Sequence, residues 1–401
     1  MANVDSATRA VSKPRAEGDS LINDPRARAL FFQIVVILGV LFCGYYLVQN
    51  TIANLERQGI ASGLGFMNTT AGFAISMNMI EYSEESSYGR AFVVSLLNTL
   101  LLAGVGVFFA TILGFIVGVA RLSKNWLVSK LATIYIETLR NIPLLLQIFF
   151  WYFGVLRAVP NPKESVEIFG VAFLNNRGLF TPKPIPEEGF SVVVISLFVA
   201  IGIVIYVARW AKKRQEATGE QFPTFWAGLG FLIVVPLLAS LIMGLPMHWD
   251  YPALKGFNFK GGLEIIPEFV AMVIALALYT ASFIAEIVRA GIQSVNYGQT
   301  EAARALGVRE SHSLRLVIIP QALRVIIPPL TSQYLNLTKN SSLAAAIAYP
   351  DLVLVFAGTV LMQTGQAVEI VLITMLVYLT ISIVISMFMN WYNAKMALVE
   401  R

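Results

Sequence analysis

The residues of this sequence that are equipped for chemistry are few and do not form a catalytic set. The 401 residues include one cysteine, Cys43, and two isolated histidines, His248 and His312. The sequence contains no GxxxxGK[ST], HExxH or GxSxG motif, so it lacks a phosphate-binding loop, a zinc-protease helix and a nucleophile elbow. It therefore predicts no enzymatic activity, no metal site and no cofactor, and it favours a transporter or channel subunit.

One polar segment, EAARALGVRESHSLRLVIIP from Glu301 to Pro320, is patterned rather than random. Thr300 is expected to cap a first short helix, and Glu301 would lie in its first turn, where the helix dipole favours a carboxylate. Gly307 is expected to end this helix. A small apolar face would be formed by Ala302, Ala303 and Leu306, which would let another protein approach closely.

A second short helix is expected from Leu314 to Ile318, ended or kinked by Pro320. The two helices would form a rigid helix-turn-helix at the surface of a membrane. Arg304, Arg309 and Arg315 are candidates for pairing with acidic groups of a partner, but solvated basic residues on the cytoplasmic side explain them equally well.

The elements that position this segment are membrane spans. The chain is 57% hydrophobic and 13% charged, with a mean hydropathy of +0.70, which indicates an integral membrane protein. A spanning helix needs about 20 apolar residues to cross roughly 30 Å of hydrocarbon. Eight segments qualify: 29–49, 91–120, 135–157, 190–208, 222–245, 268–289, 342–362 and 368–392. The uncharged segment 59–80 is excluded because it is rich in Gly, Asn, Thr and Ser, and it is expected to be interfacial or external.

The distribution of basic residues predicts the orientation. With the N-terminus inside, 20 Lys or Arg lie in cytoplasmic segments and 8 in external ones, in agreement with the positive-inside rule. Both termini are therefore expected in the cytoplasm, as a disordered tail at 1–28 and a short tail at 393–401. The net charge of +5 is interpreted against the lipid bilayer and not against nucleic acid.

The spacing within the polar segment resembles a known signature. Glu-Ala-Ala is followed by three residues, Gly307, nine residues and Val-Ile-Ile-Pro. This resembles the EAA motif of importer-type ABC permeases, EAA-x3-G-x9-I-x-L-P, with Val317 and Ile319 as conservative departures. The resemblance implies that a separate ATPase subunit docks on this segment, with Glu301, Ala302, Ala303, Gly307 and Pro320 as coupling residues.

Four further segments, 95–123, 135–153, 285–295 and 339–352, resemble the polar amino acid branch of these permeases, the histidine/glutamine-type. The resemblance implies an all-α polytopic protein with a type I importer core of five helices to which other helices are added. It also implies transport of polar L-amino acids, a periplasmic binding protein and a second permease subunit in the bacterial inner membrane. Pairing with itself stays open, but the unusual length favours a heterodimer.

The division of the chain follows from this resemblance. The core would occupy 91–157 and 267–392, with an EAA cytoplasmic loop at 290–340, preceded by a first span and periplasmic segment at 29–90. Residues 158–266 would be an insertion carrying two spans. This layout resembles the long permease subunit of general L-amino-acid and glutamate/glutamine/aspartate/asparagine uptake systems of Gram-negative bacteria.

Polar residues within the spans are candidates for the substrate pathway, because a zwitterion needs both hydrogen-bond acceptors and donors. For each of them, a role in helix packing is the competing interpretation. The candidates are Asn98, Thr99, Gln147, Thr280, Ser282, Glu286, Asn340, Ser341 and Ser342.

Two local pairs and one glycine motif lie in or beside the core spans. Glu286 is expected to pair with Arg289 one turn later, or to act in the translocation gate. Glu137 and Arg140 are expected to pair in the same way. Gly114 and Gly118 form a GxxxG motif, which favours close helix contact within the subunit or with a partner permease.

Two other classes of protein compete with the importer interpretation. A secondary transporter driven by an ion gradient would carry ionisable residues in the middle of several spans, whereas nearly all of those here lie at span ends or in loops. An intramembrane enzyme would need the catalytic set that is absent.

Overall fold

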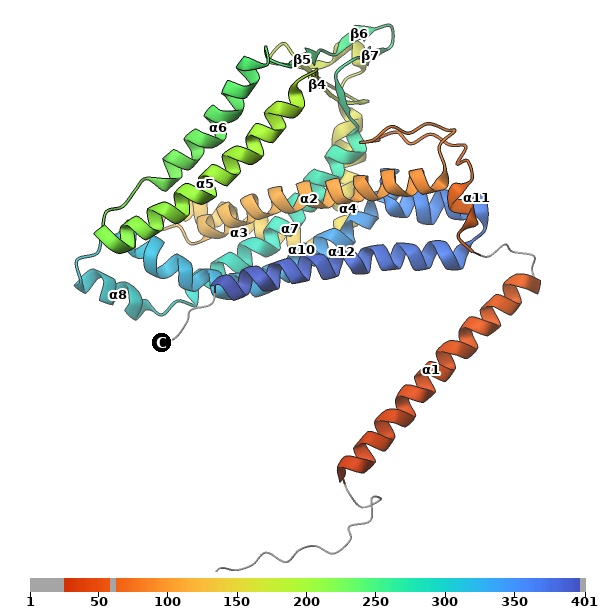
Figure 1. The fold of residues 1–401 in the computed structure, drawn as a ribbon, viewed down its shortest axis with the longest axis horizontal. Coiled ribbons are helices and arrows are strands. Elements are labelled where there is room, and N and C mark those ends of the chain that lie inside the picture. Colours follow the sequence, from red (N-terminus) through yellow and green to blue (C-terminus); the bar gives the residue numbers. More distant parts are fainter. Residues whose placement is uncertain (1–24, 58–62, 397–401) are drawn as a thin grey trace, which may run out of the picture.

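The computed structural model describes residues 25–57 and 63–396 of the chain (Figure 1). Residues 1–24, 58–62 and 397–401 lie outside the described residues. They include most of the expected N-terminal tail at 1–28 and part of the expected C-terminal tail at 393–401. Seven described helices are long and apolar enough to cross a membrane, and one bent pair makes an eighth span. The expectation of a helical protein with about eight spans is confirmed.

Four of the longer helices, α2, α7, α10 and α12, run through the body of the molecule (Figure 1). The α-helices are α1 (Pro25–Arg57), α2 (Tyr88–Arg121), α3 (Trp126–Asn141), α4 (Leu144–Phe149), α5 (Phe190–Thr218), α6 (Thr224–Ile242), α7 (Pro267–Gln293), α8 (Tyr297–Ala305), α9 (Glu310–Ser313), α10 (Ile319–Asn340), α11 (Leu361–Thr364) and α12 (Ala367–Met396).

The third span is broken. Helix α3 and the helical segment Leu144–Ala158, which begins with α4, meet at an angle of 106°. Pro143 precedes α4 and cannot continue the hydrogen-bond ladder. The buried side chain of Gln147 spans the break, since its Nε2 donates to the carbonyls of Leu139 and Ile142 at 2.9 Å each. A π-helical turn (Phe150–Val155) and a 3-10 turn (Leu156–Ala158) complete the span.

The seventh span was placed wrongly by the sequence. The spanning candidate is Glu310–Ile347, which contains α10, and not 342–362. Residues 341–364 form a 3-10 helix (Ser341–Ile347), a break at Ala348 in the left-handed region (φ 61°), and a short helix from Val353 to Thr364. The span Glu310–Ile347 has the lowest mean hydropathy of the seven, 1.4, because α10 contains polar residues and two prolines inside the helix.

The expected cytoplasmic loop at 290–340 is therefore shorter than predicted, because α10 occupies its second half. Lys339 lies at the far end of α10 from α8, so the count of basic residues becomes 19 and 9 instead of 20 and 8. The sense of the charge asymmetry is unchanged.

The core is built around the contact of α2 with α7. Gly114 and Gly118 on α2 face this contact: a methyl group added at Gly118 would lie 2.7 Å from the carbonyl oxygen of Ala285. At Gly114 it would lie 2.5 Å from the side chain of Ile284. The GxxxG motif therefore serves close packing within the subunit.

Residues 63–87 cover the end of the bundle opposite α8 without forming a span. Their regular structure is a 3-10 turn (Gly65–Asn68) and a β-bridge from Thr70 to Ser87. Phe66 and Ala71 pack with Phe356 of the 341–364 segment in one apolar cluster. The exclusion of 59–80 as a membrane helix is confirmed for its described part.

Residues 158–266 also contain short strands, which the sequence analysis did not predict. A 3-10 turn (Pro162–Glu164) leads into an antiparallel sheet in the order β1 (Val166–Ile168), β2 (Ala172–Asn175), β3 (Gly178–Thr181) and β8 (Leu263–Ile265). Two separate two-stranded antiparallel sheets are formed by β4 (Lys183–Pro186) with β5 (Met247–Asp250) and by β6 (Ala253–Lys255) with β7 (Asn258–Lys260). Phe259 stacks on Phe173 and Phe180, at centroid distances of 4.7 and 5.2 Å, and gives this region a small aromatic core.

Candidate functional site: a surface helix tied to the bundle

The surface helix α8 follows directly after α7, at the end of the molecule that we call the α8 end. Its cap is Asn296, whose side-chain oxygen accepts the backbone N–H of Gly298 at 2.8 Å. The expected cap, Thr300, was wrong: it lies inside α8. Asn and Thr both cap helices, and the tight turn after α7 starts the helix one turn earlier.

The end of α8 is fixed by a hydrogen-bonded glycine turn. Gly307 has a φ of 71°, and its N–H donates to Arg304 O at 2.9 Å while Val308 N–H donates to Ala303 O at 3.0 Å. This pair of bonds is the Schellman motif, which favours glycine at its left-handed position. The stop expected at Gly307 is confirmed.

The outward face of α8 carries both charge and apolar surface. Glu301 and Ala302 are exposed, and Leu306 is 82% exposed. Ala303 is buried against the protein instead, so the expected single face of Ala302, Ala303 and Leu306 was wrong. An exposed leucine beside an exposed alanine and a carboxylate suits a protein partner.

A second, shorter helix supports α8. Arg304 of α8 donates to Glu310 of α9 at 2.7 Å, which ties the two helices together. Pro320 was expected to end or kink the second helix, but the chain continues from α9 through a π-helical turn (Leu314–Ile318) into α10. The wider turn accommodates the proline at the start of α10, where its missing N–H costs little.

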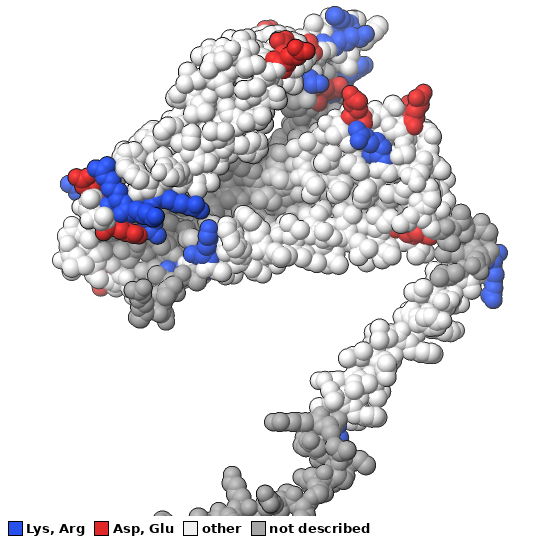
Figure 2. All heavy atoms as spheres, in the orientation of Figure 1, with Lys and Arg blue, Asp and Glu red and all other residues white. Residues whose placement is uncertain are grey.

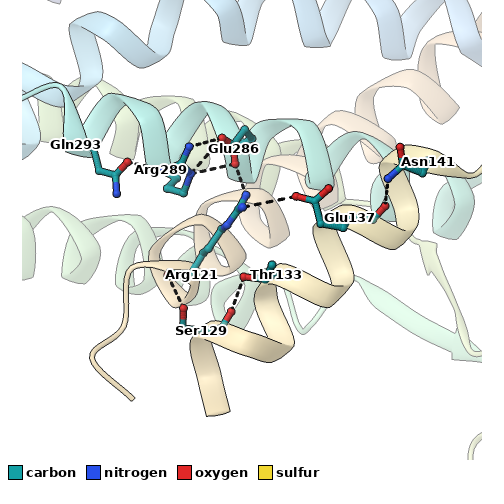
Figure 3. Close-up of polar contacts among 8 residues, drawn as sticks. All are labelled: Arg121, Ser129, Thr133, Glu137, Asn141, Glu286, Arg289 and Gln293. Atoms are coloured by element: carbon teal, nitrogen blue, oxygen red, sulfur yellow. Dashed lines mark hydrogen bonds and ion pairs between the residues drawn. The ribbon is translucent and has the colours of Figure 1, made fainter. Parts of the chain in front are cut away.

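An ion cluster connects the α8 end of α7 with two other helices (Figure 3). Glu286 accepts hydrogen bonds from Arg289 on its own helix, with Nε at 3.1 Å from each carboxylate oxygen. It also pairs with Arg121 at the end of α2. Arg121 in turn lies 3.6 Å from Glu137 of α3. The guanidinium of Arg121 thus joins α2, α3 and α7.

Two expectations about these residues had different outcomes. The pairing of Glu286 with Arg289 is confirmed. The pairing of Glu137 with Arg140 was wrong: the guanidinium of Arg140 lies over the ring of Phe283, 5.0 Å from its centroid. Arg121 was counted only as a basic loop residue, because nothing local in the sequence marks a partner 165 positions away.

Four of the candidate pathway residues make hydrogen bonds that serve packing, although the buried oxygens Asn98 Oδ1 and Gln147 Oε1 have no hydrogen-bond partner among the described residues. Asn98 Nδ2 donates to Met77 O at 2.8 Å and Pro350 O at 2.9 Å, and Thr99 Oγ1 accepts Leu352 N–H at 2.9 Å. Ser341 Oγ donates to Thr338 O, and Gln147 spans the α3–α4 break. All four are buried, and Asn98 and Thr99 hold the 341–364 segment against α2.

Two other candidates, Thr280 of α7 and Asn340 of α10, line one cavity of about 260 Å³. The structure adds Gln333 and Asn336 to it, and aromatic walls are supplied by Tyr279 and Phe283. Ser282 is buried and donates to Tyr279 O, Glu286 belongs to the ion cluster, and Ser342 is half-buried and donates to Lys339 O.

Gln333 and Asn336 were missed because their part of the chain was assigned to a cytoplasmic loop. On α10 the residues 333, 336 and 340 follow helical spacing, so that they share one face. This polar stripe was the signal that would have located the cavity.

Charge is distributed unevenly along the molecule. Figure 2 shows Lys and Arg gathered where α8 and the last turns of α5 lie, while the sides of the helices in view are nearly free of charge. Among the described residues there is no cluster of three or more His, Cys, Asp or Glu that could hold a metal ion.

A bundle of apolar spans with a polar cavity between two of its helices, and a surface helix fixed at its charged end, defines a membrane-spanning transport subunit. The chain belongs to the family of binding-protein-dependent transport system inner membrane components, whose sequence profile matches residues 110–398.

Three relatives match nearly the whole chain. The general L-amino acid transport system permease protein AapQ of Rhizobium johnstonii is 54% identical, over 95% of each chain. The putative amino-acid ABC transporter permease protein YhdX of Escherichia coli K12 is 53% identical, over 96% of this chain and 98% of the relative. The glutamate/glutamine/aspartate/asparagine transport system permease protein BztB of Rhodobacter capsulatus is 44% identical, over 95% and 96%.

Proposed function

We propose that this chain is the permease subunit of an ATP-driven importer for polar L-amino acids. A separate ATPase subunit hydrolyses ATP and docks on α8, and the permease itself catalyses no reaction. The observation that carries this proposal is the geometry of α8: a helix fixed at both ends that presents Glu301 and Ala302 to solvent at the basic end of the molecule.

The ion cluster gives a route by which movement of α8 reaches the membrane helices. Helix α8 follows α7 after a short turn, and Glu286 lies about two turns before the end of α7. Because Arg121 holds Glu286 and lies beside Glu137, a displacement of α7 is passed to α2 and α3. Alternating access needs two packed arrangements of such helices, and this tie lets the helices move as one body.

The cavity between α7 and α10 is the proposed substrate pathway. Amide oxygens of Gln333, Asn336 and Asn340 are suited to accept hydrogen bonds from a substrate ammonium group, while amide N–H groups and the Thr280 hydroxyl can donate to its carboxylate. No charged residue lines this cavity, so it fits a zwitterion recognised by hydrogen bonds. The names of the three close relatives support amino acids as the substrate class.

Three partners complete the proposed transporter in the bacterial inner membrane. A periplasmic binding protein delivers the amino acid, a second permease subunit forms the other wall of the pathway, and the ATPase lies on the cytoplasmic side. The length of the chain favours a different protein as the second permease. With the α8 end in the cytoplasm, both termini lie there too, in agreement with the excess of basic residues at that end.

Uptake by proteoliposomes tests this function. The complex of this permease with its ATPase and second permease is reconstituted, and labelled polar amino acids are supplied with the binding protein. We expect uptake that stops without ATP and survives collapse of the proton gradient. Uptake that needs the ion gradient and ignores ATP would favour a secondary transporter and refute the proposal.

A further inference from the structure

The β6–β7 hairpin, residues 253–260, is exposed over most of its length and ends in an apolar tip. Phe257, in its turn, is 77% exposed, and Leu254 is 45% exposed. The neighbouring Trp249 and Tyr251 are also about half exposed, at 48% and 55%. A cluster of large exposed side chains of this kind marks a contact with another phase or molecule.

The hairpin is held close to the outer ends of two membrane helices. Strand β4 ends at Pro186, just before α5, and strand β5 begins at Met247, just after α6, and these two residues are paired in the ladder. The two helices also meet at this level, because a methyl group added at Gly189 would lie 2.5 Å from the side chain of Met243. The β4–β5 ladder therefore begins where both helices leave the hydrocarbon.

Only a few residues separate this ladder from the hairpin tip. Phe259 is buried in the aromatic core while Phe257 stands at the turn, so the fold fixes which aromatic side chain points outward. In Figure 1, β6 and β7 lie to the side of α2 and α12, and not beyond the α11 end of these helices. The tip thus extends sideways from the bundle at the level of the membrane surface.

The charges around the tip are basic. Lys255 and Lys260 flank Phe257, and Lys163 Nζ lies 5.1 Å from the centroid of its ring. All three lysines are exposed, and none has a carboxylate within 4.0 Å among the described residues. Trp and Tyr prefer the membrane interface, and lysines there reach the phosphates of lipid headgroups.

We propose that the β6–β7 hairpin is an interfacial anchor: Phe257 and Leu254 insert among the lipid headgroups of the outer leaflet, and the three lysines bind lipid phosphates. A folded protein partner is a poorer fit, because a stable interface buries about 800 Å² on each side, more than the tip of an eight-residue hairpin offers. This inference does not depend on the substrate or on ATP.

The anchor has a structural consequence for α5 and α6. These helices pack chiefly against each other, and their buried residues are only Ala200, Ala211 and Gly228. The space-filling view shows a hollow between this helix pair and the rest of the bundle (Figure 2). An attachment at the outer leaflet would fix the tilt of the pair, which contacts within the subunit leave largely undetermined.

Spin-label depth measurements on the full-length protein in nanodiscs test the anchor. In a Cys43→Ser background, Phe257→Cys is labelled, with the nanodiscs made of phosphatidylethanolamine and phosphatidylglycerol. Labels at Val199→Cys and Lys212→Cys, both on α5, give the membrane and water references. We expect the label at 257 to collide more with oxygen than with a water-soluble nickel chelate, as at 199, and to shift toward water in a Lys255→Glu/Lys260→Glu variant.

A label at 257 that is as accessible to nickel as the label at 212 would overturn the proposal. So would a label that leaves water only when the periplasmic binding protein is added, because the hairpin would then be a protein-docking surface. If the labelled cysteine variant does not insert, Phe257→Trp decides instead: lipids brominated near the headgroup should quench its added fluorescence, and unchanged quenching relative to the wild type counts against the anchor.

Discussion

Arg121 and Glu286 are 165 residues apart in the sequence, and they form an ion pair that joins the α8 ends of α2 and α7. Both side chains are mostly buried, with 19% and 26% of their area exposed. Glu286 shares its carboxylate with Arg289, and Arg121 lies beside Glu137. The cluster therefore connects three helices, and the loss of any one member is expected to weaken the contacts of the others.

Replacing Arg121 by Ala should uncouple the permease from its ATPase. The loss leaves Glu286 with one basic partner, Arg289, and removes the polar tie that joins the end of α2 to Glu286 of α7 and Glu137 of α3. We expect a destabilisation of about 2 kcal/mol, as for other charged hydrogen bonds, and uptake that falls much more than ATP hydrolysis does. Thermal unfolding in detergent and uptake by proteoliposomes measure the two effects.

Arg140→Ala is the matched control for Arg121. Arg140 lies near the same helices but contacts the ring of Phe283 and has no carboxylate within 4.0 Å among the described residues. Its loss should leave coupling almost unchanged. An equal loss of coupling in the two variants would show that coupling depends on basic charge at this end of the molecule and not on the ion cluster.

Charge reversal at Glu301 should abolish uptake without unfolding the permease. Glu301 is exposed on α8, so Glu301→Lys alters the docking surface but no internal contact. Glu216→Lys, an exposed position on the last turns of α5 at the same end of the molecule, should transport normally. Normal uptake by the Glu301 variant would contradict the docking role of α8.

Gly118→Ala should destabilise the fold, whereas Gly104→Ala should not. A methyl group at Gly118 meets the carbonyl of Ala285, while at Gly104 on the same helix it meets nothing within 4 Å. Overpacking costs about 1–3 kcal/mol, and an unhindered Gly to Ala change in a helix stabilises by roughly 0.5–1 kcal/mol. The thermal unfolding midpoints of the two variants should therefore move in opposite directions. A fall in both midpoints would indicate that the effect of Gly118→Ala does not come from the α2–α7 contact.

Alanine substitutions at Asn336 and Asn98 should distinguish a residue that binds substrate from one that serves packing. Asn336 lines the cavity, so Asn336→Ala should raise the KM of uptake several-fold with little change in stability. Asn98 donates two buried hydrogen bonds, so Asn98→Ala should cost about 2 kcal/mol of stability. If the KM responds to Asn98→Ala at unchanged stability, the pathway lies on the α2 side instead.

The sequence located the spans well where they are uniformly apolar and poorly where they are not. Helix α10 carries two prolines and a polar stripe, and its hydropathy is low, so the more apolar segment after it was mistaken for the span. The tertiary structure resolves this because the polar face of α10 lines a cavity against α7 instead of facing hydrocarbon, and because Ala348 breaks the next segment. A hydropathy window averages over both faces of a helix and cannot detect this difference.

The sequence by itself determined the membrane class, the number of spans, the stop at Gly307 and the resemblance to ABC permeases, because these depend on composition and on residues close together in the chain. Only the tertiary structure decided that Glu286 is shared with Arg121, that Gly114 and Gly118 face α7, and that Asn336 lines a cavity. Those relationships join helices distant in sequence. They depend on which face of each helix is packed inward, and local spacing alone does not specify that.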